Sequence, residues 1–527
     1  VGYPLLLKAV AGGGGRGIRL VEREADLQAA LEAAQREAQG AFKDARVMLE
    51  KYLPQPHHVE FQVLGDTHGS MLHLYERECS VQRRHQKIIE ETPSPTLNPP
   101  LRQAMAQAAV QAARAIGYVG AGTIEFLVDE TGAFYFMEMN TRLQVEHPIT
   151  EMTLGLDLVR LQIEVAEGRP LTLRQEELRP SGHAIECRLN AENPAKRFLP
   201  SVGWIRRLEF PHGAGLRVDT GFASGAEISP YYDSLLAKLI AWGAHREEAL
   251  RRMQRMLEAT QCTGIATNLP LLQAILAQEE FQAGRYTTRF IERHEATLLR
   301  TAPAPGLLRE QLLAIAAVEA LLRLREAPAS GNGAGTLSSP WANGPALSTA
   351  PGTLPSLALR VELHGETHPL LLHVAPHPSS GAAVALDVTW QGVRHSLSVE
   401  PTAEGRALLE LEGLRLPLLW DAQGSQRWIT LRGVHALANA QQPAADASAG
   451  AAGGAERLQA PLPGKVLKVA VAAGQHVREG EVLLILEAMK VEHTITAPYA
   501  GRITGLPFKE GDLVQRNDAL VQLEPEA

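Results

Sequence analysis

Apolar residues in the first 300 positions fall into short runs and amphipathic stretches that alternate along the chain. The run LLLKAV at residues 5–10 predicts a strand, and residues 24–42 (EADLQAALEAAQREAQGAF) space their apolar side chains as a helix does. A further helix is predicted from Pro303 to Ala327, where LLREQLLAIAAVEALLRLRE keeps helical spacing. The pattern predicts a fold that mixes helices with sheets.

The pattern changes in the second half of the chain. A Gly/Ser/Pro-rich stretch, Ser330 to Ser356, precedes short strand patterns over 357–437, such as LALRVEL, PLLLHV and AVALDVTW. Residues 441–456 (QQPAADASAGAAGGAE) have the composition of a flexible linker, and a β-rich segment runs from Gln459 to the end. We therefore expect domains at 1–150, 151–300, 301–440 and 459–527, with a linker at 441–458.

Composition narrows the class of protein. A chain of 527 residues exceeds one hydrophobic core, and about three to four domains are expected. A net charge of −8 without a Lys/Arg run argues against nucleic acid as a partner, and no apolar run or leader pattern indicates a membrane or secretion. The cysteines, without CxxC spacing, argue against a disulfide framework or zinc site: Cys79, Cys187 and Cys262.

The C-terminal segment contains an internal repeat. Residues 460–487 align with residues 497–524 without a gap, at a shift of 37 positions, and the glycines and inward Val/Leu positions coincide. Two similar halves predict a quasi-twofold flattened β-barrel. The connection AMKVEHTIT places Lys490 near the turn between the halves. A lysine on a turn is ordinarily just solvated, but Ala488 and Met489 beside it change that interpretation.

This segment resembles the biotinyl carrier domain of biotin-dependent carboxylases, whose modified lysine lies in an A-M-K-M hairpin. Val491 departs from the second Met of that motif. The lipoyl domain has the same duplicated fold, but Met489 favours biotin. The resemblance implies biotin covalently attached to Lys490 by a biotin protein ligase, and the linker would extend the reach of this tethered reactant.

Three segments of the N-terminal half carry candidate ATP chemistry. AGGGGRG (11–17) exposes backbone N–H groups to polyphosphate, although a flexible surface loop would look the same, and no Walker GK[ST] follows. HHVEFQVLGD (57–66) looks like an edge strand, and a cluster of basic residues follows it. Such a cluster could bind the nucleotide or be a solvated charged face. That cluster comprises Arg83, Arg84, His85 and Lys87.

The third segment, GAGTIEFLVDETGAFYFMEMNTRLQVEHPITE, predicts a β-hairpin. Glu125 and Glu138 would lie on its two strands, and Asn140 would face the same side as Glu138. Hard oxygen ligands on one face suit Mg²⁺ or Mn²⁺ with nucleotide phosphates. The alternative, two exposed hairpin glutamates, is weakened by burial-prone neighbours: Ile124, Phe126, Phe136 and Met137.

In this order, the segments resemble the ATP-grasp core of biotin carboxylases from residue 1 to about 295, as do YYDSLLAKLIAWG and CRLNAEN. The resemblance implies that Glu125, Glu138 and Asn140 hold metal ions. ATP would be held by the remaining nucleotide-site residues. These are Lys8, Gly12, Gly13, Gly14, Gly15 and Gly17 at the phosphates, Glu50, Lys51 and Leu53 at the adenine, His58 near the ribose and His85 near the phosphates.

The same resemblance implies the bicarbonate chemistry. Glu146 would be the general base that removes the bicarbonate proton during attack on the γ-phosphate, and Arg188 would stabilise the biotin enolate. Enclosure matters because the carboxyphosphate product hydrolyses readily. Bicarbonate would be bound by Lys87, Arg142, Gln144 and the backbone of Val145.

The family's fold begins with a subdomain that precedes the Lys8 strand, and VGYPLLLKA reads as chain in mid-domain. We therefore expect a missing N-terminus and poor carboxylase activity of the chain as written. A biotin carrier without ATP activity stays open as an alternative, as does a different ATP-grasp ligase, which would not need a carrier lysine.

Residues 303–437 resemble the domain that docks the biotin subunit on its carboxyltransferase, a helix wrapped by an antiparallel barrel. No room exists for a carboxyltransferase barrel of roughly 250 residues, so that activity would reside on a separate β subunit in a hetero-oligomer. E-A-M-K-x-E-H followed by T-I-x-A-P looks most like 3-methylcrotonyl-CoA and geranyl-CoA carboxylase α subunits, with propionyl-CoA carboxylase next. Composition favours a bacterial cytoplasm, and a mitochondrial matrix is the alternative.

The complete expectation is a multidomain α+β chain. It joins an ATP-grasp biotin carboxylase core without its N-terminal subdomain, a helix-plus-β-barrel docking domain and a biotinyl flattened β-barrel. Its function would be ATP-dependent carboxylation of its own biotin by bicarbonate, with carboxybiotin supplied to a carboxyltransferase for an acyl-CoA.

Overall fold

The computed structural model describes residues 1–11, 18–196, 198–299, 305–326, 356–374, 383–442, 456–460, 463–488, 491–515 and 518–525. Two sets of candidate residues lie outside these ranges. They are the loop glycines Gly12, Gly13, Gly14, Gly15 and Gly17, and the proposed carrier lysine Lys490 with Met489.

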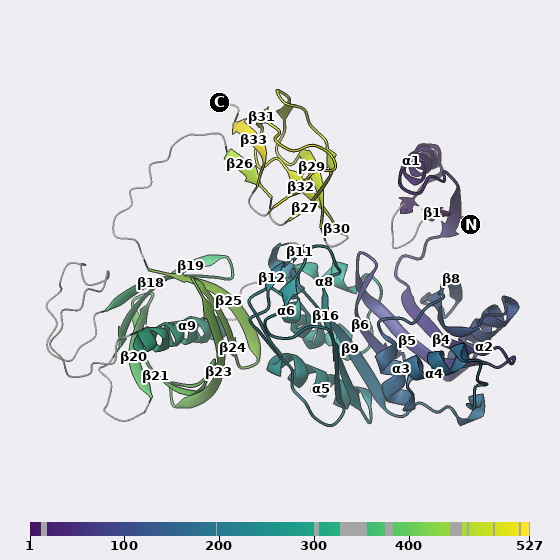
Figure 1. Ribbon diagram of the computed structural model, residues 1–527, viewed down its shortest axis with the longest axis horizontal. Helices are drawn as coiled ribbons and strands as arrows, with labels where there is room; N and C mark the ends of the chain where they lie inside the picture. The colour runs from purple at the N-terminus through teal and green to yellow at the C-terminus, as the bar shows by residue number, and fades with distance from the viewer. Residues whose placement is uncertain are drawn as a thin grey trace.

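The N-terminal residues form a small antiparallel sheet, β2-β1-β3, packed against one helix (Figure 1). Leu5 and Leu7 of β1 are buried against this helix, as the alternating pattern of LLLKAV requires. The predicted helix over 24–42 is present with these bounds. The elements are β1 (Leu5–Ala9), β2 (Ile18–Val21), α1 (Glu24–Phe42) and β3 (Val47–Lys51).

An eight-stranded antiparallel sheet, β14-β16-β9-β6-β5-β4-β7-β8, forms the centre of the molecule. It takes strands from both sides of residue 150, and in Figure 1 it extends from the side of the barrel to below the N-terminal sheet. Its strands are β4 (His57–Gly65), β5 (Met71–Arg83), β6 (Gln86–Thr92), β7 (Gly120–Val128), β8 (Phe134–Asn140), β9 (His183–Asn190), β14 (Leu216–Thr220) and β16 (Leu235–Gly243).

Strand β4 lies between β5 and β7, so the expectation of an edge strand for residues 57–66 is wrong. Its apolar face, Val59, Phe61 and Val63, is fully buried in a cluster with residues of α2. Its polar face is buried as well, with Glu60 and Gln62 at zero exposure. The sequence looked edge-like because an internal polar network, rather than solvent, covers that face.

Helices cover the sheet, and short strand pairs decorate its C-terminal half. The helices are α2 (Pro99–Ala115), α3 (His147–Leu154), α4 (Leu158–Ala166), α5 (Arg246–Ala259), α6 (Leu269–Ala277), α7 (Glu279–Gln282) and α8 (Phe290–Leu298). The strand pairs are β10 (Glu192–Asn193) with β11 (Leu199–Pro200), β12 (Gly203–Trp204) with β15 (Glu227–Ile228), and β13 (Arg207–Glu209) with β17 (Gln261–Thr263).

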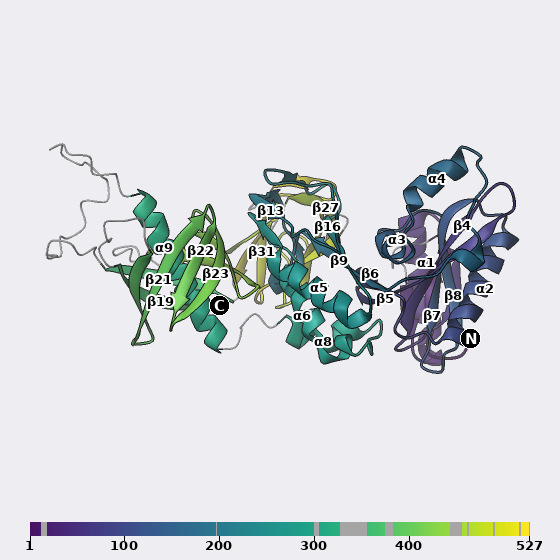
Figure 2. The ribbon, with the colours of Figure 1, turned by 90° about the horizontal axis from the view of Figure 1, so that it is seen from below.

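Eight strands, β18 to β25, form a closed barrel around helix α9, which confirms the helix-plus-barrel prediction (Figures 1 and 2). The helix α9 (Pro305–Glu326) is buried on all sides from Leu312 to Leu321. No helix in the described ranges is long and apolar enough to cross a membrane. The barrel strands are β18 (Leu357–Leu363), β19 (Glu366–Val374), β20 (Val384–Trp390), β21 (Val393–Ala403), β22 (Arg406–Leu411), β23 (Leu414–Gln423), β24 (Gln426–Leu431) and β25 (Val434–Gln441).

The C-terminal segment consists of two four-stranded sheets, β26-β33-β31-β28 and β30-β29-β27-β32. Strands β27, β28 and β29 recur 37 positions later as β31, β32 and β33, so the predicted duplicated β-fold is confirmed. The repeated inward positions Leu483 and Leu520 are both fully buried. The strands are β26 (Glu456–Gln459), β27 (Gly464–Val469), β28 (His476–Val477), β29 (Val482–Ala488), β30 (Val491–Thr496), β31 (Gly501–Gly505), β32 (Leu513–Val514) and β33 (Ala519–Pro525).

Candidate active site

The predicted hairpin is formed by β7 and β8, at the edge of the central sheet. Glu125 is paired with Glu138, and Asn140 donates a hydrogen bond to Glu125 Oε1 at 3.0 Å. Ile124 and Phe126 are buried as expected, but Phe136 is 59% exposed, so the expectation for this neighbour is wrong. Phe136 lies on β8, the last strand of the sheet, and its ring contacts that of Phe126 with 6.5 Å between the centroids.

Glu125 is the point at which the hairpin meets the rest of the site. Its Oε2 lies 3.1 Å from Nε2 of His58, and its Oε1 accepts hydrogen bonds from Lys87 at 2.9 Å and from Gln144 at 3.2 Å. Burial would raise the pKa of this carboxyl, but the hydrogen bond from His58 and the charge of Lys87 hold it far below its usual range.

Lys87 binds three carboxylates. Its Nζ lies 2.5 Å from Glu60 Oε2, 2.6 Å from Glu146 Oε1 and 2.9 Å from Glu125 Oε1. Burial opposes the charged ammonium, yet the surrounding carboxylates, Glu60 foremost, raise its pKa well above the usual value. Lys87 therefore carries a fixed positive charge at the centre of the cluster, and it is no part of a solvated charged face.

Glu146 is 1% exposed and occupies the position at which α3 begins. Its Oε2 accepts a hydrogen bond from Arg188 at 2.9 Å, opposite the bond from Lys87 to its Oε1. Although burial raises the pKa of Glu146, the charges of Lys87 and Arg188 bring it well below its ordinary value. Arg188 is held in turn by Glu90 at 2.6 Å. Glu146 is consequently ionised at neutral pH.

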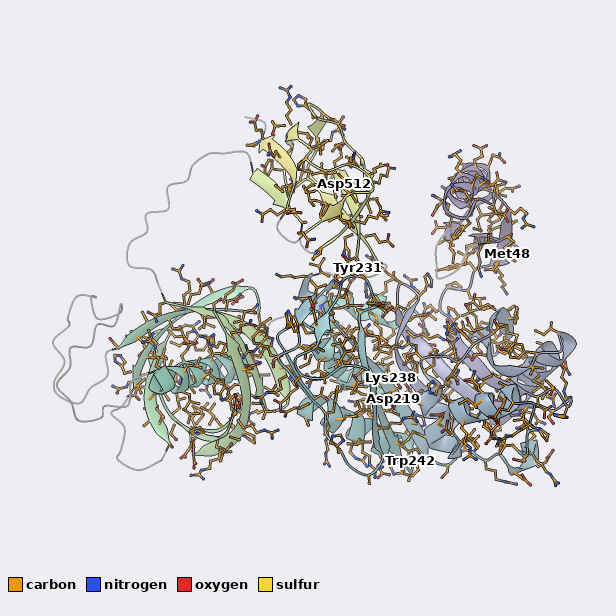
Figure 3. The ribbon with its side chains drawn as sticks, viewed as in Figure 1. Met48, Asp219, Tyr231, Lys238, Trp242 and Asp512 are labelled. Atoms are coloured by element: carbon orange, nitrogen blue, oxygen red, sulfur yellow. The ribbon has the colours of Figure 1, made fainter. Side chains whose placement is uncertain are left out.

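The segment before Glu146 is held by contacts from two directions. Arg142 donates to Gln144 Oε1 at 2.6 Å, and Lys238 of β16 donates to the carbonyl of Val145 at 3.1 Å. Lys238 also lies 3.1 Å from Asp219, and the two appear side by side in the central sheet (Figure 3). The peptide that leads into Glu146 is thereby fixed to the sheet.

Other predicted nucleotide residues lie outside this cluster. Lys8 pairs with Glu50 at 3.5 Å on the small N-terminal sheet, and Leu53 is buried just after that sheet. Lys51 donates to the Tyr135 hydroxyl at 2.8 Å, which connects β3 to β8. His85 is exposed at the β5–β6 turn, where its φ of 67° is unusual for a residue with a side chain.

Sequence reasoning missed several residues that the fold brings into the cluster. Glu60 of β4 is fully buried against Lys87, and Arg77 of β5 is fully buried against Glu60. Lys238 reaches the site from β16. The alternation of His58, Glu60 and Gln62 along one strand could have indicated a polar face. Nothing local marks Arg77 or Lys238, because their partners are distant in the sequence.

The donor set fits the chemistry predicted for it. Glu125, Glu138 and Asn140 present oxygen ligands within one antiparallel pair, the type that Mg²⁺ and Mn²⁺ prefer. Lys87 and Arg188 supply positive charge around a buried, ionised Glu146. Such an arrangement can bind a small anion and accept its proton while charge develops on a transferring phosphoryl group.

Comparison with protein families gives three matches. Residues 1–174 match the carbamoyl-phosphate synthase L chain ATP-binding domain, and residues 186–293 match the biotin carboxylase C-terminal domain. Residues 456–523 match the family described as biotin-requiring enzyme.

The solved structures that resemble this chain include carboxylases. The biotin carboxylase domain of 2-oxoglutarate carboxylase from Hydrogenobacter thermophilus, solved with MgADP, ADP and bicarbonate, is 50% identical with a TM-score of 0.55, and the match covers 56% of this chain and 66% of that chain. Pyruvate carboxylase from Rhizobium etli is 44% identical with a TM-score of 0.56, over 60% of this chain and 29% of that chain.

Similarity to curated proteins extends over nearly the full chain. The mitochondrial methylcrotonoyl-CoA carboxylase subunit alpha of Dictyostelium discoideum is 39% identical over 99% of this chain and 74% of that relative. The rat protein of the same name is 36% identical over 100% and 73%, and mouse propionyl-CoA carboxylase alpha chain is 37% identical over 99% and 71%. The chain therefore belongs to the family of biotin-carboxylating α subunits of acyl-CoA carboxylases.

Proposed function

We propose that this chain uses ATP and bicarbonate to carboxylate biotin attached to its own Lys490. The observation that carries the proposal is the buried carboxylate of Glu146, held at its two oxygens by Lys87 and Arg188. A base of fixed orientation beside two cations is what phosphorylation of bicarbonate requires. The duplicated β-fold, with Met489 and Lys490 between β29 and β30 in the sequence, would supply the carrier.

The first step is phosphoryl transfer to bicarbonate. Arg142, Gln144, Lys87 and the backbone of Val145 bind bicarbonate, and Glu146 removes its proton as an oxygen attacks the γ-phosphorus and ADP leaves. Glu125, Glu138 and Asn140 would hold Mg²⁺ or Mn²⁺, which neutralises phosphate charge when bound. The adenine would lie at Glu50, Lys51 and Leu53, the ribose near His58, and the phosphates near Lys8, His85 and the glycines at 12–17.

The second step transfers the carboxyl group. Carboxyphosphate releases CO₂ and phosphate within the enclosed site, and the phosphate accepts the ureido N–H proton of biotin. Arg188 donates to the ureido oxygen as negative charge develops there. The ureido nitrogen then attacks CO₂, which forms the C–N bond.

The holoenzyme is proposed to contain a separate carboxyltransferase β subunit, which docks on the barrel at 305–442 and carboxylates an acyl-CoA. Among the similar curated proteins, methylcrotonoyl-CoA carboxylase α subunits favour 3-methylcrotonyl-CoA, and the propionyl-CoA carboxylase α chains make propionyl-CoA the second candidate. The relatives from Dictyostelium discoideum and rat are named mitochondrial, which supports a matrix location as the alternative to a bacterial cytoplasm.

The test combines mass spectrometry with an ATP assay. The chain is expressed with a biotin protein ligase, and a biotin-sized mass increment is expected on the peptide that contains Lys490 and is absent from Lys490→Arg. Bicarbonate should stimulate ADP formation in the presence of biotin. Glu146→Gln should lower this stimulated rate by about 10²–10⁴-fold, while biotinylation stays complete.

Glu130→Gln, at an exposed turn of the β7–β8 hairpin, is the matched control and should keep the stimulated rate. A lipoyl increment or an unmodified Lys490 would refute the carrier assignment. ADP formation that ignores bicarbonate would refute the carboxylase assignment.

A further inference from the structure

We propose that Arg77 of β5 is a positioning residue that holds Glu146 and Lys87 in the geometry needed to bind and deprotonate bicarbonate. This inference rests on the proposed function. Arg77 is one of the largest side chains that are completely buried in the described ranges, and it lies on a central strand of the sheet rather than at its surface.

The guanidinium of Arg77 is bound by side chains from three different elements. Its Nε donates to Glu60 Oε1 at 2.6 Å, and its Nη1 donates to Gln62 Oε1 at 2.8 Å, both on β4. The same Nη1 donates to Thr150 Oγ1 of α3 at 3.0 Å, and Nη2 donates to Thr123 Oγ1 of β7 at 3.2 Å. Arg77 therefore connects β4, β7 and α3 beneath the site.

One connection to Glu146 passes through Glu60. Arg77 holds Oε1 of this carboxylate, while Oε2 lies 2.5 Å from Lys87. Lys87 in turn lies 2.6 Å from Glu146 Oε1. A carboxylate fixed at both oxygens has little rotational freedom. Arg77 therefore fixes the position of the Lys87 ammonium through Glu60.

A second connection passes through the backbone. Thr150 lies in α3, four positions after Glu146, and Glu146 is the N-cap residue directly before that helix. The hydrogen bond from Arg77 to Thr150 fixes this end of α3 against the sheet. The carboxylate of Glu146 is thus located both through Lys87 and through its own helix.

A purely structural role is the competing interpretation, because a buried charged group that loses its partners destabilises any fold. Two features distinguish the roles. The four acceptors of Arg77 all lie on elements that carry site residues: β4 with His58, β7 with Glu125, and α3 with Glu146. If Arg77 were only structural, its loss would lower the fraction of active protein. If it positions Glu146 and Lys87, its loss displaces them and changes the affinity for bicarbonate without changing the affinity for ATP.

The variants are chosen as matched pairs. Arg77→Met removes the guanidinium and its charge, and Arg77→Lys replaces it by an ammonium. Arg246→Met is the control, because Arg246 also binds a buried glutamate, Glu91, which points to the opposite side of β6 from Glu90. Thr150→Val removes only the bond to α3. Thr153→Val is its control on the same helix, since its hydroxyl bonds only to carbonyls of Ile149 and Thr150.

The experiment compares KM for bicarbonate with KM for ATP in bicarbonate-dependent ADP formation by the biotinylated chain. Arg77→Met should raise KM for bicarbonate by about tenfold and Thr150→Val by about threefold, with KM for ATP changed less than about twofold. Arg77→Lys should recover part of the loss. The Arg246 and Thr153 controls should leave both KM values in place.

An unchanged KM for bicarbonate in Arg77→Met and Thr150→Val would overturn the proposal. If Arg77→Met does not fold, the Thr150 and Thr153 pair decides. ADP formation by the parent chain that does not depend on bicarbonate would count against the proposed function and not against Arg77. In that case, or if no ADP forms, amide hydrogen exchange at residues 144–151 decides on Arg77. Faster exchange there in Thr150→Val than in Thr153→Val supports the positioning role, and equal exchange refutes it.

Discussion

At the scale of single residues, a buried charge in the central sheet is stable where hydrogen-bond donors surround it, as they do at Glu91. Glu91 of β6 accepts hydrogen bonds from Arg246 at 2.7 and 2.8 Å, from His183 at 2.5 Å and from Tyr286. Burial raises the pKa of Glu91, but the donors His183 and Arg246 outweigh it and lower the pKa to about 2. This carboxylate therefore stabilises the folded state as an anion.

Glu91→Gln should remove that contribution. A pKa lowered from 4.5 to about 2 corresponds to about 3 kcal/mol, present above pH 4.5 and lost as the pH falls from 4.5 toward 2. Urea unfolding followed by circular dichroism should therefore show the largest deficit of the variant at neutral pH and a shrinking deficit below pH 4.5. The exposed Glu295→Gln should match the parent, and a deficit independent of pH would contradict the argument.

Some site residues could be identified from the residues next to them in the sequence. Glu125 and Glu138 could be paired from the hairpin pattern, and Glu146 was carried by the resemblance. Arg77 and Glu60 could not be identified in that way. They meet 17 positions apart, and the hydrophobic pattern alone cannot say that the polar face of β4 points into a buried site.

At the scale of elements, helix α9 fits its barrel because small residues line it. Ala314, Ala316, Ala317 and Ala320 are fully buried among leucines of the barrel wall, and an eight-stranded barrel has little room for larger side chains around a helix. The sequence predicted the helix to within two residues at its start and one at its end. It did not predict a buried ion pair between the helix and the barrel.

That contact joins Glu319 of α9 to Arg427 of β24, both buried. Glu319→Leu should destabilise the barrel by about 3–5 kcal/mol, because the buried guanidinium of Arg427 loses its counterion. The double variant Glu319→Leu with Arg427→Met should recover most of this loss. Thermal unfolding of the four proteins of this double-mutant cycle measures the effect, and additive losses would show that the pair is not coupled.

At the scale of the whole molecule, the barrel is fastened to the C-terminal half of the central sheet. Asp421 of β23 accepts two hydrogen bonds from Arg206, at 3.0 and 3.1 Å, and one from Thr263 at 2.5 Å. Arg406 pairs with Glu209 at 2.9 Å, so the contact spans several barrel turns. These partners lie 158 to 215 positions apart in the sequence. The sequence indicated both units but carried no signal that they touch.

Acid should loosen this contact through His435. Its Nε2 donates to the carbonyl of Leu257 in α5 at 3.0 Å, and its Nδ1 accepts from Thr430 at 2.8 Å. Burial lowers the pKa of His435 to about 4, so the folded state disfavours protonation. The contact between barrel and α5 should then have its full stability above pH 6.5. Its stability should fall by up to about 3 kcal/mol as the pH drops from 6.5 to 4.

His435→Gln keeps a donor for Leu257 but cannot be protonated in this range. Amide hydrogen exchange at residues 255–259 and 430–436, corrected for intrinsic rates, should accelerate between pH 7 and pH 5 in the parent chain and in the exposed control His373→Gln. It should not accelerate in His435→Gln. His435→Gln removes the imidazole that burial holds neutral, so the acceleration should be lost in this variant alone. If exchange accelerates equally in all three proteins, a group other than His435 controls the contact between barrel and sheet.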